Sequence, residues 1–354
     1  MKKLLCAIFM LLLVVSPLCA CYGQNEITDE MFALDTIITF KITDNDIALA
    51  TDTIEKCKDE ITRLENLLSA TKPDSDIYNI NNSKGEKVKV NAETAELIRI
   101  SLDISKSCDG AFDISVYPIV KLWGFDTKEY KVPDDNELKD ILNFVGFENI
   151  SVSDDNFVTI KNGMNIDLGG IAKGYIANCV RSVMQEQNID KGLINLGGMV
   201  VVYNSDENND GWEIGVEYPD TGDVFAKFYT KTPFTVTSGA YQRFFEEDSN
   251  RYHHIIDPNT ARPSDSDISS VTLITNDGVY GDALSTAFYV LGIDNTLEYI
   301  KTHKDSTGES YSFIILSKNK DKVYISSDLR EGEFKLYKAY ENEVEIEVVD
   351  TKFV

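Results

Sequence analysis

The residues best suited to chemistry lie in the last third of the chain. Two of its three histidines, His253 and His254, are adjacent. Further on, Asp282 and Thr286 lie four residues apart in an apolar pattern of helical period, which puts both on one face of a helix. Histidine is the commonest general base near neutral pH, and carboxylate and hydroxyl oxygens are ligands that Mg²⁺ accepts. This combination suggests metal-assisted group transfer.

Each of these signals also has an ordinary interpretation. Aspartate is common at helix starts, so Asp282 alone would fit a helix cap, with Thr286 bonding back to the preceding turn. The two histidines would fit a surface pair. On a strand, only one of two adjacent residues faces a given side, and the sequence does not say which histidine that is.

The N-terminus predicts export. Lys2 and Lys3 precede an apolar run that ends at Val15, which is too short to span a bilayer and is flanked like a signal peptide. The run leads into Leu-Cys-Ala-Cys ending at Cys21, which resembles the lipobox of bacterial lipoproteins and implies lipidation of Cys21. The alternative is an ordinary secretory signal. We expect a signal peptide at 1–20, a tether on the membrane surface at 21–30 and the folded domain at 31–354.

The charge balance limits the partners. The formal net charge is −25, which argues against nucleic acid and against binding to anionic lipid. It also makes a phosphate-rich ligand difficult to bind unless a cation mediates. The cysteines that follow the signal peptide form neither a disulfide framework nor a zinc-ligand pattern.

Strand and helix signals are mixed rather than regularly alternating. Apolar residues from Ile54 to Leu68 recur every three or four positions, which predicts a long amphipathic helix, and Asn91 is suited to cap a second one. Further helices are expected after Gly169-Gly170 and from Asp282 to Leu291. The strands we expect are at 34–42, near 152, and at 158–160, 193–196, 199–203, 212–216, 224–229, 234–236, 312–316, 323–326, 334–337 and 344–349. This pattern predicts the α+β class, as one two-lobed domain of mixed and antiparallel sheets with packed helices.

The run from Asn165 to Gly174 offers a carboxylate, a glycine turn and a lysine. It is not a Walker A loop, because Lys173-Gly174 reverses the required order, and it lacks the G-x-G-x-x-G fingerprint of dinucleotide-binding folds. The ordinary interpretation is a turn into a helix with Lys173 in solvent. Likewise, Gly197-Gly198 is suited to a bulge, and the aromatic residues around Trp123 to a core.

Taken together, these runs resemble the FAD:protein FMN transferases of the ApbE family. The resemblance covers nearly the whole chain after the signal peptide, and the matching segments occur in the family's order. They are Leu34-Asp35-Thr36, S-D-I-Y-N-I-N ending at Asn81, G-A-F-D at 110–113, L-W-G-F at 122–125, D-L-G-G-I-A-K-G-Y at 167–175, L-I-N-L-G-G at 193–198, T-S-G at 237–239, H-H-I-I-D-P-N-T at 253–260 and D-A-L-S-T-A at 282–287.

This resemblance implies an ApbE-like fold and Mg²⁺-dependent transfer of the FMN half of FAD onto a Thr or Ser hydroxyl of an exported acceptor protein, with release of AMP. A subunit of a membrane electron-transfer complex is the acceptor it implies. By position, it implies that Asp282, Thr286 and the Gly170 carbonyl bind the metal and that His254 is catalytic. The flavin and adenine contacts it implies are Leu34, Asn81, Ala111, Phe112, Asp113, Asp167, Lys173 and the Ile255 backbone.

On this basis we expect His254 to take the proton of the acceptor hydroxyl and Asp257 to orient it, while Mg²⁺ and Lys173 balance charge on the phosphates. Two alternatives stay open. The same site could hydrolyse FAD to FMN and AMP, or the chain could be a lipoprotein that binds flavin or another solute without chemistry. The second alternative predicts two lobes with regular βαβ alternation and no dependence on Mg²⁺.

Five positions depart from the family pattern, the first being Leu34 in place of the methionine of the usual Met-Gly-Thr turn. Asp35 replaces the glycine of the usual Met-Gly-Thr turn, and Met199 replaces the Asp that often follows the Gly-Gly pair. Ala261 replaces a glycine, and Gly281 occupies a position where alanine is common. None of these departures removes an expected metal ligand, but those in the turns make the flavin contacts less secure than the metal site.

Overall fold

The computed structural model describes residues 25–205, 211–303, 311–330 and 334–351. The expected signal peptide and Cys21 therefore lie outside the described residues. Within the described ranges, no helix combines the length and the apolar character needed to cross a bilayer.

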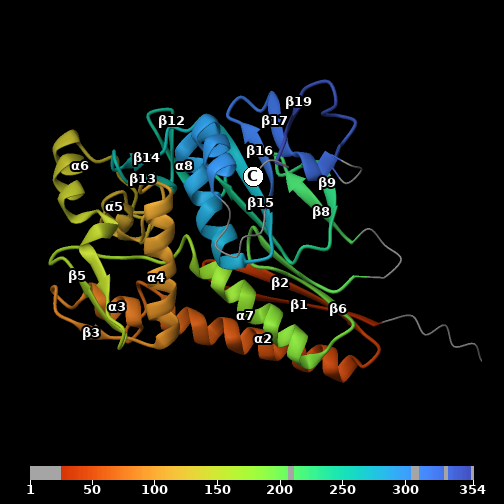
Figure 1. Ribbon diagram of the computed structural model, residues 1–354, viewed down its shortest axis with the longest axis horizontal. Coiled ribbons are helices and arrows are strands. Elements are labelled where there is room, and N and C mark those ends of the chain that lie inside the picture. The colour runs from red at the N-terminus through yellow and green to blue at the C-terminus, as the bar shows by residue number, and fades with distance from the viewer. Residues whose placement is uncertain (1–24, 206–210, 304–310, 331–333, 352–354) are drawn as a thin grey trace, which may run out of the picture.

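A nine-stranded sheet forms the centre of the molecule (Figure 1). Neighbouring strands are antiparallel except for the last pair, which is parallel. Such a sheet confirms the predicted α+β class and differs from the regular βαβ lobes expected of a solute-binding protein. In sheet order the strands are β1 (Asn25–Ala33), β2 (Thr36–Asp44), β6 (Lys191–Asn195), β7 (Met199–Tyr203), β10 (Phe234–Gly239), β15 (Ile268–Thr275), β16 (Ser312–Ser317), β17 (Lys322–Ser326) and β19 (Glu345–Val349).

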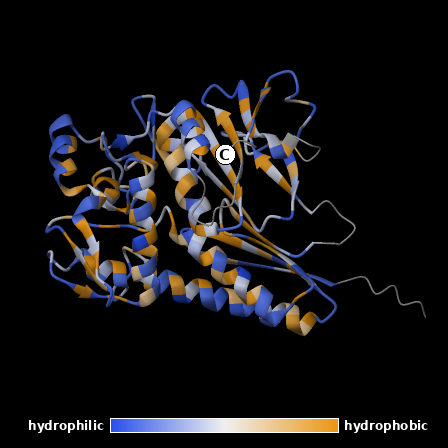
Figure 2. Ribbon diagram, viewed as in Figure 1, coloured by the Kyte–Doolittle hydropathy of each residue, from blue (hydrophilic) through white to orange (hydrophobic). Residues whose placement is uncertain are grey.

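Three helices pack on one face of this sheet: α2 (Ile47–Leu68), α7 (Ala172–Gln187) and α8 (Gly278–Thr302). The apolar positions that predicted α2 are all buried in it, and each buried side chain of this kind stabilises the fold by roughly 1.5–3 kcal/mol. Figure 2 shows α2 with hydrophilic and hydrophobic positions interleaved along its length, as expected for a helix with one buried side.

The opposite face is covered by a small sheet of β8 (Trp212–Glu217), β9 (Val224–Thr230) and β18 (Lys335–Leu336). Phe225 and Phe228 of β9 are fully buried between the two sheets. This small sheet packs against the middle and the C-terminal side of the central sheet, because its apolar contacts are with β7, β15, β16 and β17.

A second lobe lies on the left in Figure 1. Its core includes a cluster of aromatic rings in which Trp123 and Phe125 are fully buried, which confirms the core interpretation of this segment. Its helices are α3 (Asp76–Asn81), α4 (Ala92–Ser107), α5 (Tyr117–Leu122) and α6 (Asp135–Ile141). Its strands are β3 (Val88–Lys89), β4 (Ile150–Val152), β5 (Phe157–Ile160), β11 (Phe244–Glu247), β12 (Asn250–His253), β13 (Ile256–Asp257) and β14 (Arg262–Pro263).

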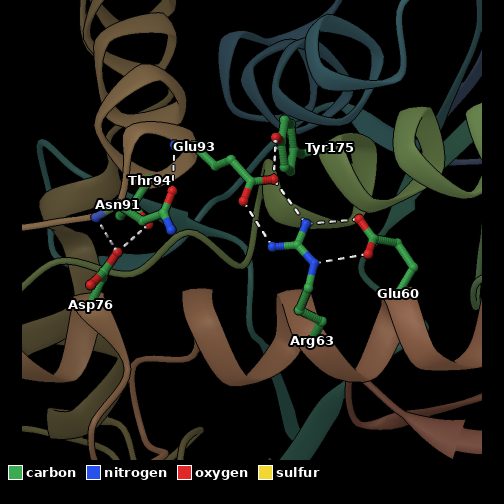
Figure 3. A network of polar contacts seen from close by, with 7 residues as sticks. All are labelled: Glu60, Arg63, Asp76, Asn91, Glu93, Thr94 and Tyr175. Carbon is green, nitrogen blue, oxygen red and sulfur yellow. Dashed lines mark hydrogen bonds and ion pairs between the residues drawn. The ribbon is translucent and has the colours of Figure 1, made fainter.

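A polar network joins the helices of the two lobes (Figure 3). Arg63 of α2 forms paired hydrogen bonds to Glu60 of the same helix and to Glu93 of α4. The hydroxyl of Tyr175, in the first turn of α7, donates to Glu93 at 2.9 Å. Glu93 therefore ties three helices together at the point where α7 begins.

Two sequence-based boundaries were wrong. The tether expected at 21–30 includes most of β1, because residues 25–33 pair with β2 along their full length. The polar side chains of β1 hid this strand, since its stability comes from backbone pairing with β2. The last long helix begins at Gly278, not at Asp282, while its expected end at Leu291 coincides with a break at Gly292, where φ is +77°.

Candidate active site

Asn81 fixes the loop that leads into α7. Its side-chain amide accepts a hydrogen bond from the Ile166 N–H at 2.7 Å and donates to the Ile166 carbonyl at 2.9 Å. The backbone carbonyl of Asn81 accepts a hydrogen bond from the side-chain amide of Asn165. The resemblance implied a flavin contact for Asn81. In the structure both ends of its amide bind the loop backbone, so Asn81 positions this loop, and its flavin contact stays a prediction.

The segment from Ala111 to Asp113 divides into two roles. Asp113 is buried and accepts hydrogen bonds from the Ser115 and Phe147 N–H groups, at 2.7 and 2.9 Å, and burial raises its pKa. Its carboxylate therefore binds the protein's own backbone, and its expected ligand contact stays a prediction. Ala111 and Phe112 are also buried, and the Phe112 ring lies 3.1 Å from the position that a Cβ on Gly170 would take. Of these three residues, Phe112 adjoins the glycine turn.

The crossing of α7 and α8 builds the centre of the site. Gly174 lies against the backbone of Gly278, where a side chain would collide with the Gly278 carbonyl. This close approach brings the Gly174 N–H to 3.0 Å from Oδ2 of Asp282. Asp277, not Asp282, caps α8. The cap interpretation of Asp282 was therefore wrong, and its carboxylate, only 3% exposed, faces the start of α7.

The predicted metal-binding residues lie in one group. The Thr286 hydroxyl is 3.8 Å from the Cβ position of Gly170 and bonds back to the Asp282 carbonyl at 3.4 Å, as its ordinary interpretation expected. Lys173 Nζ lies 3.9 Å from Asp282 Oδ1 and 3.5 Å from the Gly169 carbonyl. Lys173 is thus only partly in solvent, because it also contacts this carboxylate.

The chemistry of these donors suits one kind of metal. Over the described ranges, no group of three or more His, Cys, Asp and Glu side chains could hold a metal ion. Asp282, Thr286 and Gly170 instead offer a carboxylate, a hydroxyl and a backbone carbonyl, which are all oxygen donors. Such a partial set fits Mg²⁺, which commonly combines one or two protein carboxylates with substrate phosphates, and does not fit zinc.

The two adjacent histidines have different environments in the structure. His253, at the end of β12, is 8% exposed; its ring packs edge-on against Tyr289, and Nε2 contacts the Ser264 carbonyl at 3.1 Å. Burial lowers the pKa of His253 to about 4. His254 lies just beyond β12 and is half-buried. Its Nδ1 lies 3.0 Å from the Arg243 carbonyl, which also accepts the His254 backbone N–H.

This contact determines which nitrogen of His254 carries the proton. A carbonyl oxygen only accepts hydrogen bonds, so Nδ1 must be the protonated nitrogen and Nε2 carries the free lone pair. Among the residues that the structure describes, Nε2 has no hydrogen-bond partner. Burial, together with the positive charges of Arg243 and Lys173, lowers the pKa of His254 to about 3 and keeps the ring neutral. Nε2 is therefore the nitrogen of His254 that could accept a proton.

Asp257 has a different role from the expected one. Its carboxylate accepts hydrogen bonds from the Asn259 N–H at 2.9 Å and from the Thr260 hydroxyl at 3.0 Å. It therefore shapes the turn after β13, and the orienting position beside His254 is occupied by the Arg243 carbonyl. This corrects the interpretation of Asp257 as the residue that orients the histidine.

Arg243 is the functional candidate that the sequence did not reveal. Its guanidinium donates to the Phe125 carbonyl and is half-buried. Burial raises the pKa of Asp167, while the Gly169 N–H and the charges of Arg243 and Lys173 oppose that rise. Two cations thus flank Asp167 in a strongly acidic protein. The role of the Arg243 carbonyl leaves no trace in the sequence, because any residue carries the same group.

Leu34 and Ile255, two further implied flavin contacts, lie in segments that connect strands. Leu34 and Asp35 link β1 to β2 with φ of +55° and +59°, as a two-residue type I′ hairpin requires. The Leu34 N–H donates to Glu65, and its side chain packs on the core beneath α2. Ile255 is buried, and its carbonyl accepts from the Ser264 N–H at 2.9 Å.

Two departures from the family pattern have a structural explanation. Ala261 retains the left-handed backbone of the glycine it replaces, with φ of +56°, and its carbonyl accepts the Trp123 indole N–H at 2.8 Å. Gly281 has no room for alanine, because a Cβ there would lie 2.7 Å from Cγ2 of Thr275.

Comparison with known proteins gives the lineage. The sequence model of the ApbE family matches residues 34–308. The chain belongs to the ApbE family. It is 32% identical over 299 residues to the FAD:protein FMN transferase of Klebsiella pneumoniae, covering 83% of this chain and 89% of that protein.

Further relatives of this ApbE-family chain agree. It is 32% identical over 255 residues to the FAD:protein FMN transferase of Treponema pallidum, covering 67% of this chain and 70% of that protein. The crystal structure of the ApbE protein of Thermotoga maritima superposes with a TM-score of 0.76 at 30% identity, covering 91% of this chain and 99% of that one. The predicted ApbE-like fold is therefore confirmed.

Proposed function

We propose that this chain transfers the FMN moiety of FAD to a hydroxyl of an acceptor protein and releases AMP. The observation that carries the proposal is that Lys173 lies near both a nearly buried Asp282 and a neutral His254 whose Nε2 is unpaired among the described residues. The chain also belongs to a family whose named relatives are FAD:protein FMN transferases. Transfer of a phosphoryl group from a diphosphate requires a carboxylate that binds a cation and a base that is free to accept a proton.

The cation would be Mg²⁺, held by Asp282, Thr286 and the Gly170 carbonyl. When bound, it would neutralise charge on the diphosphate, which a protein of net charge −25 cannot otherwise hold easily. Lys173 and Arg243 add positive charge beside Asp167, where the transferred phosphoryl group would carry its own negative charge.

The chemical step uses His254 as the base. Nε2 takes the proton from a Thr or Ser hydroxyl of the acceptor as that oxygen bonds to the phosphorus of the FMN half. The bond from this phosphorus to the bridging oxygen breaks, and its electron pair leaves with AMP. The Arg243 carbonyl keeps Nδ1 protonated, so Nε2 meets the hydroxyl with its lone pair free and carries the proton after the transfer.

The test compares two aspartates of α8. Purified protein is incubated with FAD, Mg²⁺ and the exported proteins of cells that lack this enzyme, and flavin fluorescence is read on denaturing gels. We expect the wild type and Asp277→Asn to label a protein band, because Asn caps a helix as well as Asp does. Asp282→Asn should label none at Mg²⁺ concentrations that saturate the wild type.

Equal labelling by Asp282→Asn would contradict the assigned site. Release of FMN and AMP without a labelled band would indicate FAD hydrolysis in place of transfer. FAD binding without either product would indicate a binding protein.

We further propose that the chain is exported and lipid-anchored at Cys21, and that its acceptor is an exported subunit of a membrane electron-transfer complex. The lipobox-like sequence supports the anchor, and only residues 21–24 would separate it from β1. Cell fractionation tests this: Cys21→Ser should move the protein from the membrane to the soluble exported fraction. Retention of the variant on the membrane would contradict the anchor.

A further inference from the structure

Two large apolar side chains near the turn of the β1–β2 hairpin face solvent. Phe32 is 72% exposed and Ile37 is 60% exposed, the highest values among the large hydrophobic side chains of the described residues. They are direct cross-strand partners, so their side chains lie together on one face of the hairpin. The next residue of β2, Ile38, points to the other face and is fully buried.

This apolar pair is confined to the turn end of the hairpin. Farther along the same face the cross-strand pairs are Glu30 with Thr39 and Thr28 with Lys41, which are polar. Polar residues in place of Phe32 on β1 and Ile37 on β2 would fit the alternation of buried and exposed positions equally well. Apolar side chains at this one place therefore suggest a surface that becomes covered.

The hairpin turn beside this pair is linked to the active site through the other face of β2. Thr36, next to Ile37, packs against Gly197 in the β6–β7 turn, and the Cβ position of Gly198 lies 3.0 Å from Nε2 of Gln242. Gln242 is followed by Arg243, whose carbonyl holds His254. The turn thus lies a few contacts from the catalytic base, and a segment on the exposed pair would reach that base around the turn.

The edge of the sheet adds a second feature. β1 is the end strand of the nine-stranded sheet, so one side of its backbone is not paired with another strand in the described structure. Such an edge can receive an added extended segment. Glu30 is exposed beside Phe32 and has no ion-pair partner among the described residues, so the edge favours a partner with basic residues.

We propose that Phe32, Ile37 and the edge of β1 form the docking surface for the acceptor protein, which places an extended apolar segment with a basic flank on the hairpin. This proposal rests on the proposed function, because only a protein substrate needs a surface beyond the site that holds FAD. A second copy of the chain and a lipid surface are the competing occupants.

The test uses the mature protein with both side chains changed, Phe32→Ser together with Ile37→Ser. The matched control is Ile346→Ser, which changes an exposed apolar residue on β19, at the opposite edge of the same sheet. With the exported proteins of enzyme-deficient cells as substrate, we expect the double variant to lower the initial labelling rate about 10-fold or more at low substrate concentration. A high concentration of the acceptor proteins should restore the labelling rate of the double variant. Its affinity for FAD and its thermal stability should not change.

A double variant that labels at the wild-type rate, or a control that loses as much as the double variant, would overturn the docking surface while leaving the transferase intact. A wild-type dimer that dissociates in the double variant by sedimentation would assign the patch to a second copy. Loss of flotation with phosphatidylglycerol vesicles, measured on the Cys21→Ser form, would assign it to lipid. If the wild type labels no protein, the proposed function fails first and the docking proposal with it.

Discussion

Two clusters of charged residues meet at the start of α7, and they differ in how completely they are paired. In the network of Figure 3, Arg63 holds Glu60 and Glu93 with paired hydrogen bonds, and Tyr175 adds another. In the active site, Lys173 approaches Asp282 only to 3.9 Å, and Nε2 of His254 has no partner among the described residues. Completed pairing indicates a structural role, whereas unused pairing capacity indicates chemistry.

The two clusters lie only two residues apart on the chain. Tyr175 anchors the first turn of α7 to α4, while Lys173 and the Gly174 N–H of that turn meet Asp282. The paired cluster therefore holds in place the helix start on which the unpaired cluster depends. Substitutions in the two clusters should separate stability from activity.

The largest expected effect is on activity alone. His254→Ala removes the base and should lower transfer by about 10²–10⁴-fold while FAD affinity and melting temperature stay close to the wild type. His303→Ala is the control, because that histidine stacks on Tyr299 at the far end of α8. Gel fluorescence measures transfer, and quenching of flavin fluorescence measures binding. A His254→Ala variant with full activity would remove the base assignment.

The opposite result is expected for Glu93→Gln. It should lower the free energy of unfolding by about 1–2 kcal/mol, because it weakens charged hydrogen bonds that are partly exposed. The transfer rate per folded molecule should not change. Glu96→Gln on the same helix, which loses only a surface pair with Arg99, should cost less than about 0.5 kcal/mol. Denaturant titration measures both. A Glu93→Gln variant as stable as Glu96→Gln would show that the network is not structural.

The pH dependence of the same variant sharpens the comparison. Hydrogen bonds from Arg63 and Tyr175 lower the pKa of Glu93 below its ordinary 4.5. Its folded pKa is therefore below its unfolded pKa, so its contribution is present at neutral pH and is lost as the pH falls through the folded pKa. The stabilities of the wild type and Glu93→Gln should converge in acid. A constant difference between pH 7 and pH 3 would contradict this.

The active site should respond to pH differently. Since the pKa of His254 is lowered to about 3, the free enzyme keeps this base neutral well below the ordinary histidine value of 6.5. We expect kcat/KM for FAD to show no acid limb near pH 6.5 from this group, because kcat/KM reports the free enzyme. The negative charge of bound FAD would raise this pKa in the complex. A tenfold loss per pH unit below 6.5, absent from His254→Gln, would contradict the assignment.

The smallest effect is expected outside both clusters. Asp35 holds a left-handed backbone in the hairpin turn, so Asp35→Gly should stabilise the fold by about 0.5–1 kcal/mol. Thermal unfolding measures the shift. Destabilisation by glycine would mean that the Asp35 side chain stabilises the turn by more than its backbone strain costs.

Much of the fold was predictable because local periodicity reports burial. The positions that predicted α2 are its buried face, β7 has the predicted bounds, and Asn91 caps α4 as expected. β1 was missed because its side chains are mostly exposed and its pairing is with backbone. β15 was missed although its residues are almost all buried, since a fully buried strand shows no alternation.

By itself, the sequence determined the family motifs, the α+β class and the spacing that puts Asp282 and Thr286 on one helix face. Only the tertiary structure showed that His253 and His254 have different partners, that Asn81, Asp113 and Asp257 hydrogen-bond within the protein's own loops, and that the Arg243 carbonyl contacts His254. The reason is physical. The type of a residue determines which hydrogen bonds its side chain can form. Which partner it binds depends on the fold, because the fold brings together backbone segments that are far apart in the chain.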